Sequence, residues 1–500
     1  MQSAASILSQ YPVLPRTYDF VTQKRKMYID GEWVGASNGD TRPIIEPSTG
    51  EVLASVPEAT MEDVDRAVVA ARRAFTQGPW STLKPYDRQQ LLLKLADLIE
   101  ANADAFAQLE SLDNGKSVVA AREADVEGAI RFFRYMAGWA TKLEGSTKTL
   151  SAPGSSMAYT LREPVGVVGA IVPWNFPFSM AAWKVAPALA CGCTLVLKPA
   201  EFTPLSALLL AELIEQTGFP PGVFNVVTGN GSVAGSALSN HPLVDKIAFT
   251  GSTAVGKMVG HAAVENMTRT SLELGGKSPV IVLQDCDVQV AAQGAADAIF
   301  FNQGQVCCAG SRLYIHRKIY DQVVTELARI ADNIHQAPGL DPACEMGPLV
   351  SRQQFEKVSS YIDLGVEEGA ELVTGGHNSQ GTGYFVKPTV LADTNNSMRV
   401  VQEEIFGPVV CAQPFDSIES VINSANDTPY GLGASIWSNN LSQVHQMIPR
   451  IQAGVVWVNT HNPVDPCLPF GGFKASGFGR EQGREQLEHF LETKSVWLQL

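Results

Sequence analysis

The chain has 500 residues, of which 45% are hydrophobic, and a formal net charge of −14. This length predicts two to four domains with sizeable cores. A chain this acidic lacks the clustered positive charge with which proteins bind phosphate backbones, so we expect no nucleic-acid partner. The longest apolar stretches, such as residues 185–197, contain proline and glycine and are shorter than a membrane span, so we expect no membrane association.

The N-terminal segment and the cysteines indicate a compartment. Residues 1–20 lack a basic stretch followed by a long apolar run, so a secretory signal is not expected. Eight cysteines are scattered without framework spacing, and the pairs Cys191/Cys193 and Cys307/Cys308 are too close in sequence to bridge easily. We therefore expect reduced thiols and a cytoplasmic location.

The first third of the chain predicts short strands followed by helices. Residues 27–51 alternate short apolar runs with turn residues, which is typical of small strands. Thr60 can cap a helix whose apolar residues recur at helical spacing over residues 64–75. The same spacing predicts helices over residues 86–112 and 121–140.

From Pro164 the pattern changes to an alternation of strands and helices. Five apolar runs predict strands, at residues 166–172, 194–198, 224–227, 246–250 and 271–274. Four helical segments lie between them, at residues 179–189, 204–217, 232–238 and 254–267. Apolar runs joined by helices predict a parallel sheet wound on both sides, with ligands at the carboxyl ends of its strands. A second alternating set from near Val280 to about Ala475 predicts another α/β domain.

Three short patterns resemble functional sites but lack the required context. GASNG at residues 35–39 lies in a polar turn rather than between a strand and a helix. GSTAVGK at residues 251–257 is one residue short of a phosphate-binding loop, and Met258 stands where that loop carries a hydroxyl. The eight histidines show no metal-ligand spacing, so we expect no metal site.

Three side chains stand out as chemical candidates. Cys307 lies among glycines and polar residues, which is not the setting of a core cysteine. Glu273 ends a predicted central strand. Burying a carboxylate there costs folding free energy unless it has a functional role or a partner such as Lys277. Asn175 lies on a strand-end loop near a helix N-terminus, and its alternative role is a turn residue before Pro177.

Seven motifs in one order then resemble the aldehyde dehydrogenase family over nearly the whole chain. They are PWNFP, LKPAE, TGSTAVG, LELGGKSP, GQVC, EEIFGP and PFGGFKASGFGRE. The segment WVNTH followed by LPFGG resembles the phenylacetaldehyde dehydrogenase branch of that family. The resemblance implies an α/β fold with two doubly wound parallel-sheet domains, a Rossmann-like cofactor domain and a catalytic domain, plus a β-arm for oligomerisation.

The resemblance also implies how the chain is divided. The expected NAD-binding domain comprises residues 1–145 and 166–273, and the catalytic domain comprises residues 274–477. Residues 146–165 and 478–500 are expected to form the oligomerisation arm and tail, because the arm alternates apolar and polar residues across a Pro-Gly turn. The apolar end SVWLQL would be hazardous as a free edge, so we expect it to pair with another subunit. A homo-oligomer is expected, with a tetramer favoured over a dimer.

The implied reaction is NAD-dependent oxidation of an aldehyde to a carboxylic acid. Cys307 matches the family nucleophile, with Cys308 as the alternative, and a thiohemiacetal and then a thioester form on its sulfur. The Asn175 amide and the Cys307 N–H match the donors to the oxyanion. Glu273 matches the base that activates water for hydrolysis. We weigh against this a CoA-acylating enzyme, a catalytically silent structural relative and a nucleotide-binding regulator.

The resemblance assigns cofactor residues in four groups. They are a cleft wall (Ile171, Val172, Pro173, Trp174), a pair for the adenosine ribose (Lys198, Glu201), a turn for the pyrophosphate (Gly251, Ser252, Gly256) and a nicotinamide-ribose ligand with its neighbour (Glu404, Phe406). A carboxylate at Glu201 accepts a ribose 2′-hydroxyl and repels a 2′-phosphate, which favours NAD over NADP. A purely structural ion pair is the alternative for Lys198 and Glu201.

The implied substrate tunnel is apolar and aromatic. Its matching positions are Phe176, Met180, Trp183, Phe301 and Phe470. Such a lining suits phenylacetaldehyde or a related aryl-alkyl aldehyde. The alternatives are a broad-specificity aldehyde dehydrogenase and, for the aromatic residues, plain core packing.

Overall fold

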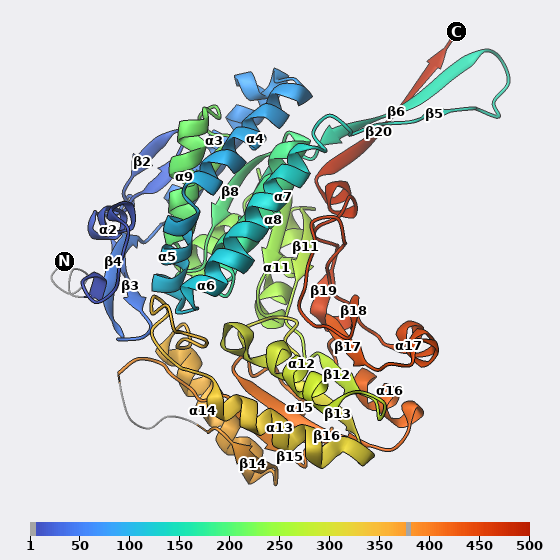
Figure 1. The fold of residues 1–500 in the computed structure, drawn as a ribbon. Helices are drawn as coiled ribbons and strands as arrows, with labels where there is room; N and C mark the ends of the chain where they lie inside the picture. Colours follow the sequence, from blue (N-terminus) through green and yellow to red (C-terminus); the bar gives the residue numbers. More distant parts are fainter. Residues whose placement is uncertain (1–6, 377–381) are drawn as a thin grey trace.

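The computed structural model describes residues 7–376 and 382–500 and contains two large β-sheets flanked by helices (Figure 1). The first sheet has eight strands, in the spatial order β19 (Gly477–Phe478), β11 (Arg269–Glu273), β10 (Lys246–Thr250), β7 (Val167–Ile171), β8 (Thr194–Lys198), β9 (Phe224–Val226), β1 (Met27–Ile29) and β2 (Glu32–Val34). The five central strands are parallel, as predicted, and the edge strands β19 and β1–β2 run antiparallel to their neighbours.

Strand order places a topological switch point in the middle of this sheet. From β7 the chain passes outward to β8 and β9, and then crosses to β10 and β11 on the other side of β7. The loops that follow β7 and β10 therefore diverge at one edge, where open α/β sheets bind ligands. The first of these loops carries Asn175 and the second carries Gly251.

Helices cover both faces of the first sheet because the strand residues alternate between two cores. The flanking helices are α3 (Met61–Thr76), α8 (Pro177–Cys191), α9 (Leu205–Thr217), α10 (Ser236–Ser239) and α11 (Thr253–Glu265). Val167 and Ile171 belong to the core that contains residues of α3, α10 and α11. Val168 and Ala170 belong to the core that contains residues of α8 and α9. The period of two is the one that buries a sheet on both faces.

The N-terminal helices confirm one prediction and revise two. Thr60 caps α3 in a reciprocal capping box with Asp63. The helix predicted over residues 86–112 is two helices, α4 (Pro85–Ala101) and α5 (Ala103–Asn114), because the backbone leaves the helical region at Asn102. The helix predicted over residues 121–140 begins as a π-helical turn (Ala121–Val126) before α7 (Glu127–Ala137).

The second sheet is the other predicted α/β unit. Its seven strands follow the order β14 (Glu371–Thr374), β15 (Thr389–Ala392), β16 (Val409–Phe415), β13 (Arg312–His316), β12 (Pro279–Val282), β17 (Gly433–Trp437) and β18 (Val455–Val458). All neighbours are parallel except β14, which is antiparallel to β15. Its helices are α12 (Val288–Phe300), α13 (Tyr320–Asn333), α14 (Arg352–Glu367), α15 (Arg399–Gln402), α16 (Ile418–Asn426) and α17 (Leu441–Met447).

A three-stranded arm projects from the body of the molecule (Figure 1). It consists of β5 (Thr147–Lys148), β6 (Ser156–Pro164) and β20 (Leu491–Gln499). The C-terminal strand β20 pairs antiparallel with β6 of its own chain, from Leu491 opposite Pro164 to Gln499 opposite Ser156. One edge of the SVWLQL segment is therefore paired within the chain, a pairing that the sequence analysis did not predict. Its other edge has no strand partner among the described residues.

Smaller elements complete the described chain. They are helix α2 (Pro15–Thr22), the hairpin of β3 (Thr41–Glu46) and β4 (Glu51–Pro57), and the short helix α6 (Val118–Ala120). Within the described ranges, no helix has the length and apolar character needed to cross a membrane.

Candidate active site

A cavity of about 1100 Å³ collects most of the predicted site residues from both large sheets. Its lining includes the three catalytic candidates, six cofactor candidates and all five substrate candidates: Cys307, Glu273, Asn175; Pro173, Trp174, Gly251, Ser252, Glu404, Phe406; Phe176, Met180, Trp183, Phe301 and Phe470. Five predicted cofactor residues do not line it: Ile171, Val172, Lys198, Glu201 and Gly256.

Asn175 is fixed beside the segment that leads to Cys307. Its side-chain Nδ2 donates to the carbonyl oxygen of Gln305 at 2.9 Å. Its own carbonyl oxygen accepts from Lys116 Nζ and from Asn302 Nδ2, each at 2.9 Å. An amide nitrogen has two N–H groups, so Asn175 can offer its second one to another acceptor in the cavity.

The backbone before Cys307 is held in a strained conformation. Asn302 (φ 48°), Gln303 (φ 56°) and Gly304 (φ 69°) are consecutive left-handed residues. Such φ values cost about 1–3 kcal/mol at a residue other than glycine and persist only where the surroundings enforce them. At Gly304 a Cβ would lie 2.0 Å from the carbonyl oxygen of Gly407, so glycine is also required there by space.

The thiol of Cys307 is half-buried and rests in its protonated form. The neighbouring Cys308 thiol and burial raise the pKa of Cys307 well above its usual value, and the backbone N–H of Cys308 acts in the opposite direction. Because the thiolate is the nucleophilic form, attack requires that the proton leave the sulfur. Gly276, which follows β11, lies close to the backbone of Cys307. A Cβ on Gly276 would lie 2.6 Å from the Cys307 carbonyl oxygen, so glycine is required for this approach.

Glu273 is a buried carboxylate without a hydrogen-bond partner. It ends β11, is 4% exposed, and neither Oε1 nor Oε2 has a partner among the described residues. Burial raises its pKa well above the usual value, the carboxylate of Glu481 raises it further, and Lys184 lowers it. The ion pair with Lys277 that was the structural alternative is absent from the described contacts, because the Lys277 Nζ also has no partner there.

Sequence analysis missed a buried ion pair beside Glu273. Lys184 Nζ lies 2.5 Å from Glu481 Oε1 and donates to Thr250 Oγ1, also at 2.5 Å. Lys184 lies in the helix predicted over residues 179–189, and Glu481 ends the PFGGFKASGFGRE motif. Neither segment predicts their meeting, because it is created by the tertiary fold.

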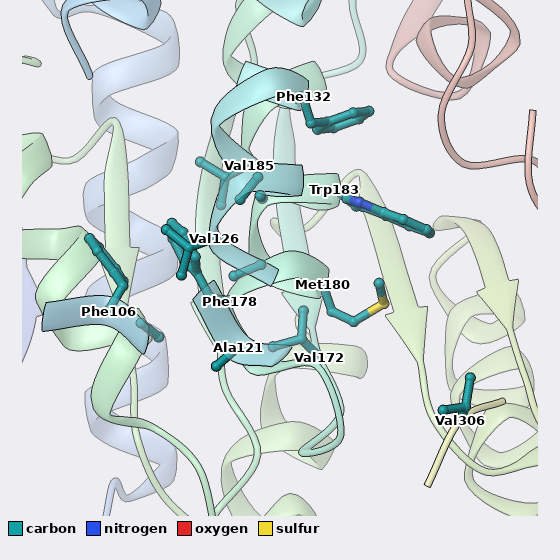
Figure 2. Packing of buried hydrophobic residues seen from close by; sticks show 14 of the residues in the cluster. Phe106, Ala121, Val126, Phe132, Val172, Phe178, Met180, Trp183, Val185 and Val306 are labelled. Atoms are coloured by element: carbon teal, nitrogen blue, oxygen red, sulfur yellow. The ribbon is translucent and has the colours of Figure 1, made fainter. Parts of the chain in front are cut away.

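The tunnel wall is aromatic on one side. The rings of Phe176 and Phe301 are 6.2 Å apart and stacked, and those of Trp183 and Phe470 are 5.6 Å apart at 65°. Figure 2 shows Met180 and Trp183 projecting in the same direction from α8. Sequence analysis missed part of this lining, which also includes Phe132, Phe300, Ala124 and Gly128.

Glu404 and its neighbours form a second polar group in the cavity. Glu404 Oε1 accepts from the backbone N–H of Gly276 at 3.0 Å. Gln354 Nε2 donates to the Phe406 carbonyl at 2.7 Å, and the ring of Phe406 lies 5.1 Å from that of Trp174 in a perpendicular contact. Gln354 and Lys357 line the cavity but were not predicted, since they lie outside the motifs.

The remaining cofactor candidates have local structural contacts. Lys198 Nζ is buried and lies 3.4 Å from Glu201 Oε2. Burial lowers the pKa of Lys198, and Glu201 opposes that shift. Ser252 caps α11 by accepting from the Val255 N–H at 3.3 Å. At Gly256 a Cβ would lie 2.4 Å from a Leu274 methyl, so this glycine lets α11 pack on the sheet.

The described residues contain no group of three histidine, cysteine, aspartate or glutamate side chains arranged to hold a metal ion. The lining of the cavity supplies the Cys307 thiol, the carboxylates of Glu273 and Glu404, the Asn175 amide and an apolar tunnel.

Comparisons with known proteins agree with the motifs. The profile of the aldehyde dehydrogenase family matches residues 33–496. A phenylacetaldehyde dehydrogenase of Pseudomonas fluorescens is 52% identical over 477 residues, covering 94% of this chain and 95% of that protein. A mitochondrial benzaldehyde dehydrogenase of Antirrhinum majus is 45% identical over 495 residues, covering 99% of this chain and 92% of that protein.

Solved structures agree as well. The NAD+ complex of an aldehyde dehydrogenase from Bacillus cereus is 48% identical, covers 98% of this chain and 99% of its own, and superposes with a TM-score of 0.96. The predicted α/β fold is thus confirmed. The family profile, the curated relatives and the solved structure together show that the chain belongs to the aldehyde dehydrogenase family.

Proposed function

We propose that this protein oxidises an aldehyde to the carboxylic acid, with Cys307 as nucleophile and NAD as hydride acceptor. The observation that carries the proposal is that Cys307, Glu273 and Asn175, which are far apart in the sequence, line one cavity. The solved relative from Bacillus cereus, which is described as an NAD+ complex, supports the choice of cofactor.

In the first step the Cys307 thiol gives up its proton to a water molecule, and the resulting thiolate attacks the aldehyde carbonyl. A carbon–sulfur bond forms and the carbonyl oxygen becomes an oxyanion, which needs donors already in place. The second N–H of the Asn175 amide and the Cys307 backbone N–H are the proposed donors. The strained turn over residues 302–304 and the hydrogen bonds of Asn175 keep these groups from moving during attack.

The second step removes a hydride and leaves a thioester on Cys307. NAD, when bound, supplies the hydride acceptor. Glu273 then takes a proton from a water molecule that attacks the thioester and releases the acid. An unpartnered carboxylate with a raised pKa is suited to accept that proton, and Lys184 limits how far its pKa rises.

The cavity has features that fit a dinucleotide. A Cβ on Gly275 would lie 2.3 Å from Glu404 Oε2, so only glycine allows the backbone to come so close to this carboxylate. Glu404 would hold the nicotinamide ribose, with Phe406 beside it. Ser252 and the N-terminus of α11 would meet the pyrophosphate. Lys198 and Glu201 would hold the adenosine ribose, and the carboxylate of Glu201 favours NAD over NADP.

Phenylacetaldehyde or a related aryl-alkyl aldehyde is the proposed substrate. The stacked Phe176 and Phe301 and the Trp183–Phe470 contact provide flat apolar surfaces for a ring. The name of the Pseudomonas fluorescens relative supports this choice. A broad specificity for aliphatic and aromatic aldehydes is the second candidate, supported by the benzaldehyde dehydrogenase among the relatives.

The test is NADH formation with phenylacetaldehyde, hexanal, benzaldehyde and betaine aldehyde. We expect the highest kcat/KM with phenylacetaldehyde and no requirement for CoA. Equal rates with hexanal would favour the broad-specificity enzyme. Absence of NADH from every aldehyde unless CoA is added would overturn the hydrolytic role of Glu273.

The proposed assembly is a cytoplasmic homotetramer. Residues 1–145 with 166–273 are the proposed NAD-binding domain, residues 274–477 the catalytic domain, and residues 146–165 with 478–500 the arm and tail. The free edge of β20 supports the assembly, because an exposed apolar strand edge is a ready site for pairing with another subunit.

A further inference from the structure

His461 is a buried polar side chain in the cavity wall that the proposed reaction does not use. It follows β18, within the WVNTH segment, and both of its ring nitrogens are hydrogen-bonded. Nε2 lies 2.8 Å from the carbonyl oxygen of Cys308, and Nδ1 lies 2.8 Å from Ser435 Oγ. The Trp457 ring packs at 4.8 Å on its other side.

These partners determine which ring nitrogen carries the proton. The Cys308 carbonyl can only accept, so His461 Nε2 must be the donor. In the neutral ring Nδ1 then accepts from the Ser435 hydroxyl, and Ser435 Oγ in turn accepts from Trp437 Nε1 at 3.2 Å. Burial lowers the pKa of His461 to about 4, so the ring is neutral near neutral pH. The donor chain from Trp437 to Cys308 is therefore complete and runs in one direction.

The group at the end of this chain is the residue next to the nucleophile. The backbone N–H of Cys308 lowers the pKa of Cys307, and the Cys308 carbonyl is the group that His461 holds. The N–H of the same peptide unit, that of Ala309, closes a turn on the Val306 carbonyl at 3.0 Å. The turn over residues 306–309, which includes Cys307, is thus held at this peptide by both His461 and Val306.

We propose that His461 is a positioning residue for the aldehyde reaction: through its hydrogen bond to the Cys308 carbonyl it holds the turn over residues 306–309, which carries the Cys307 thiol and the Cys308 N–H. The inference rests on the proposed function, because it assumes that Cys307 is the nucleophile. It goes beyond that proposal by assigning a positioning role to His461, the histidine of the WVNTH segment. Because both ring nitrogens are hydrogen-bonded to protein groups, neither is left to bind the substrate.

The test compares His461→Phe, which keeps a flat ring without donors, with His461→Gln, which can place an amide N–H where ring Nε2 lies. Both are made in the Cys308→Ala background, which keeps the Cys308 backbone and removes the competing thiol. The rate of Cys307 alkylation by iodoacetamide is followed against pH by mass spectrometry of the peptide, alongside kcat and KM for NADH formation. Thermal unfolding reports whether each variant is folded.

For His461→Phe we expect the alkylation midpoint to rise by about one pH unit, which is about tenfold slower alkylation below it. We expect kcat to fall about tenfold, with KM changed less than about threefold, and His461→Gln to recover most of both. An unchanged midpoint and kcat in folded His461→Phe would overturn the proposal, as would a Gln variant no better than Phe.

A third variant covers the case in which His461→Phe does not fold. Ser435→Ala keeps the ring but removes the hydroxyl that donates to its far nitrogen, so we expect the same changes at smaller size, and their absence would count against the proposal. Failure of the proposed function is distinguishable, because it would appear as NADH formation by Cys307→Ala. Failure of the His461 inference alone would leave that control inactive and the alkylation profile unmoved.

Discussion

The cavity centre and the β-arm differ in how completely contacts within one chain bury and pair their residues. At the centre, Glu273 and Asn175 are each 4% exposed, and Asn175 is held by Gln305, Lys116 and Asn302 of the same chain. In the arm, Trp497 is 57% exposed and Leu500 is 78% exposed, and β20 has a strand partner along only one edge within the described residues.

This difference indicates which properties belong to the single chain. The reacting groups are positioned by contacts within one subunit, so chemistry should survive changes in assembly. The arm exposes apolar side chains on a strand edge, which is the pattern of a surface that another chain covers. Substitutions in the two regions should therefore have separable effects.

The largest effect is expected for Cys307→Ala. Removal of the nucleophile should lower kcat by at least about 10³-fold, since the thioester of the proposed reaction forms on its sulfur. Cys308→Ala is the matched control and should keep kcat within about fivefold. NADH formation measures both variants, and size-exclusion chromatography should show the same assembly as the parent protein. Activity lost in Cys308→Ala and kept in Cys307→Ala would exchange their roles.

Lys184→Met should have the next largest effect. Lys184 lowers the pKa of Glu273, so its loss should raise that pKa further and move the acid limb of the kcat profile to higher pH, because the base must be ionised. The variant also leaves Glu481 buried without a cation, which costs about 3–5 kcal/mol of folding stability. The double variant Lys184→Met/Glu481→Gln should regain most of the stability. An acid limb at its original pH in the folded single variant would count against the coupling.

Glu201→Ser should have a moderate effect limited to the cofactor. Loss of the carboxylate should raise KM for NAD about tenfold and lower the preference for NAD over NADP, with little change in kcat. Steady-state kinetics with both dinucleotides measure this. If KM for NAD does not change, Glu201 serves only as the ion-pair partner of Lys198.

The smallest effect on chemistry is expected for deletion of residues 496–500. The truncation should weaken assembly, which sedimentation velocity measures, before it changes kcat. It removes part of a strand that pairs with β6, so the comparison needs folded protein by circular dichroism. Unchanged sedimentation would contradict the role given to the arm.

Local patterns predicted the central strands well. The runs at residues 194–198 and 246–250 form β8 and β10 with the predicted bounds. Strands buried on both faces are nearly continuous apolar runs, which are easy to recognise in a sequence. Cys307, Glu273 and Asn175 were identified from motifs, and the fold brings them to one cavity.

Features that depend on distant contacts were missed. The Lys184–Glu481 pair joins α8 to a segment near the C-terminus, and no pattern in either segment indicates the other. The break at Asn102 and the π-helical turn preserve the apolar spacing, so periodicity did not reveal them. The pairing of β20 with β6 was missed because an apolar strand sequence does not indicate which other strand it will pair with.

The most direct test of the account is mass spectrometry of Glu273→Gln incubated with NAD and phenylacetaldehyde. Without the base, hydrolysis should become the slow step, so one equivalent of NADH should form and the acyl group should remain as a thioester on Cys307. Cys307→Ala/Glu273→Gln should carry no acyl group. An acyl group on Cys308, or a single-turnover burst of NADH with no acyl group on any cysteine, would contradict the account.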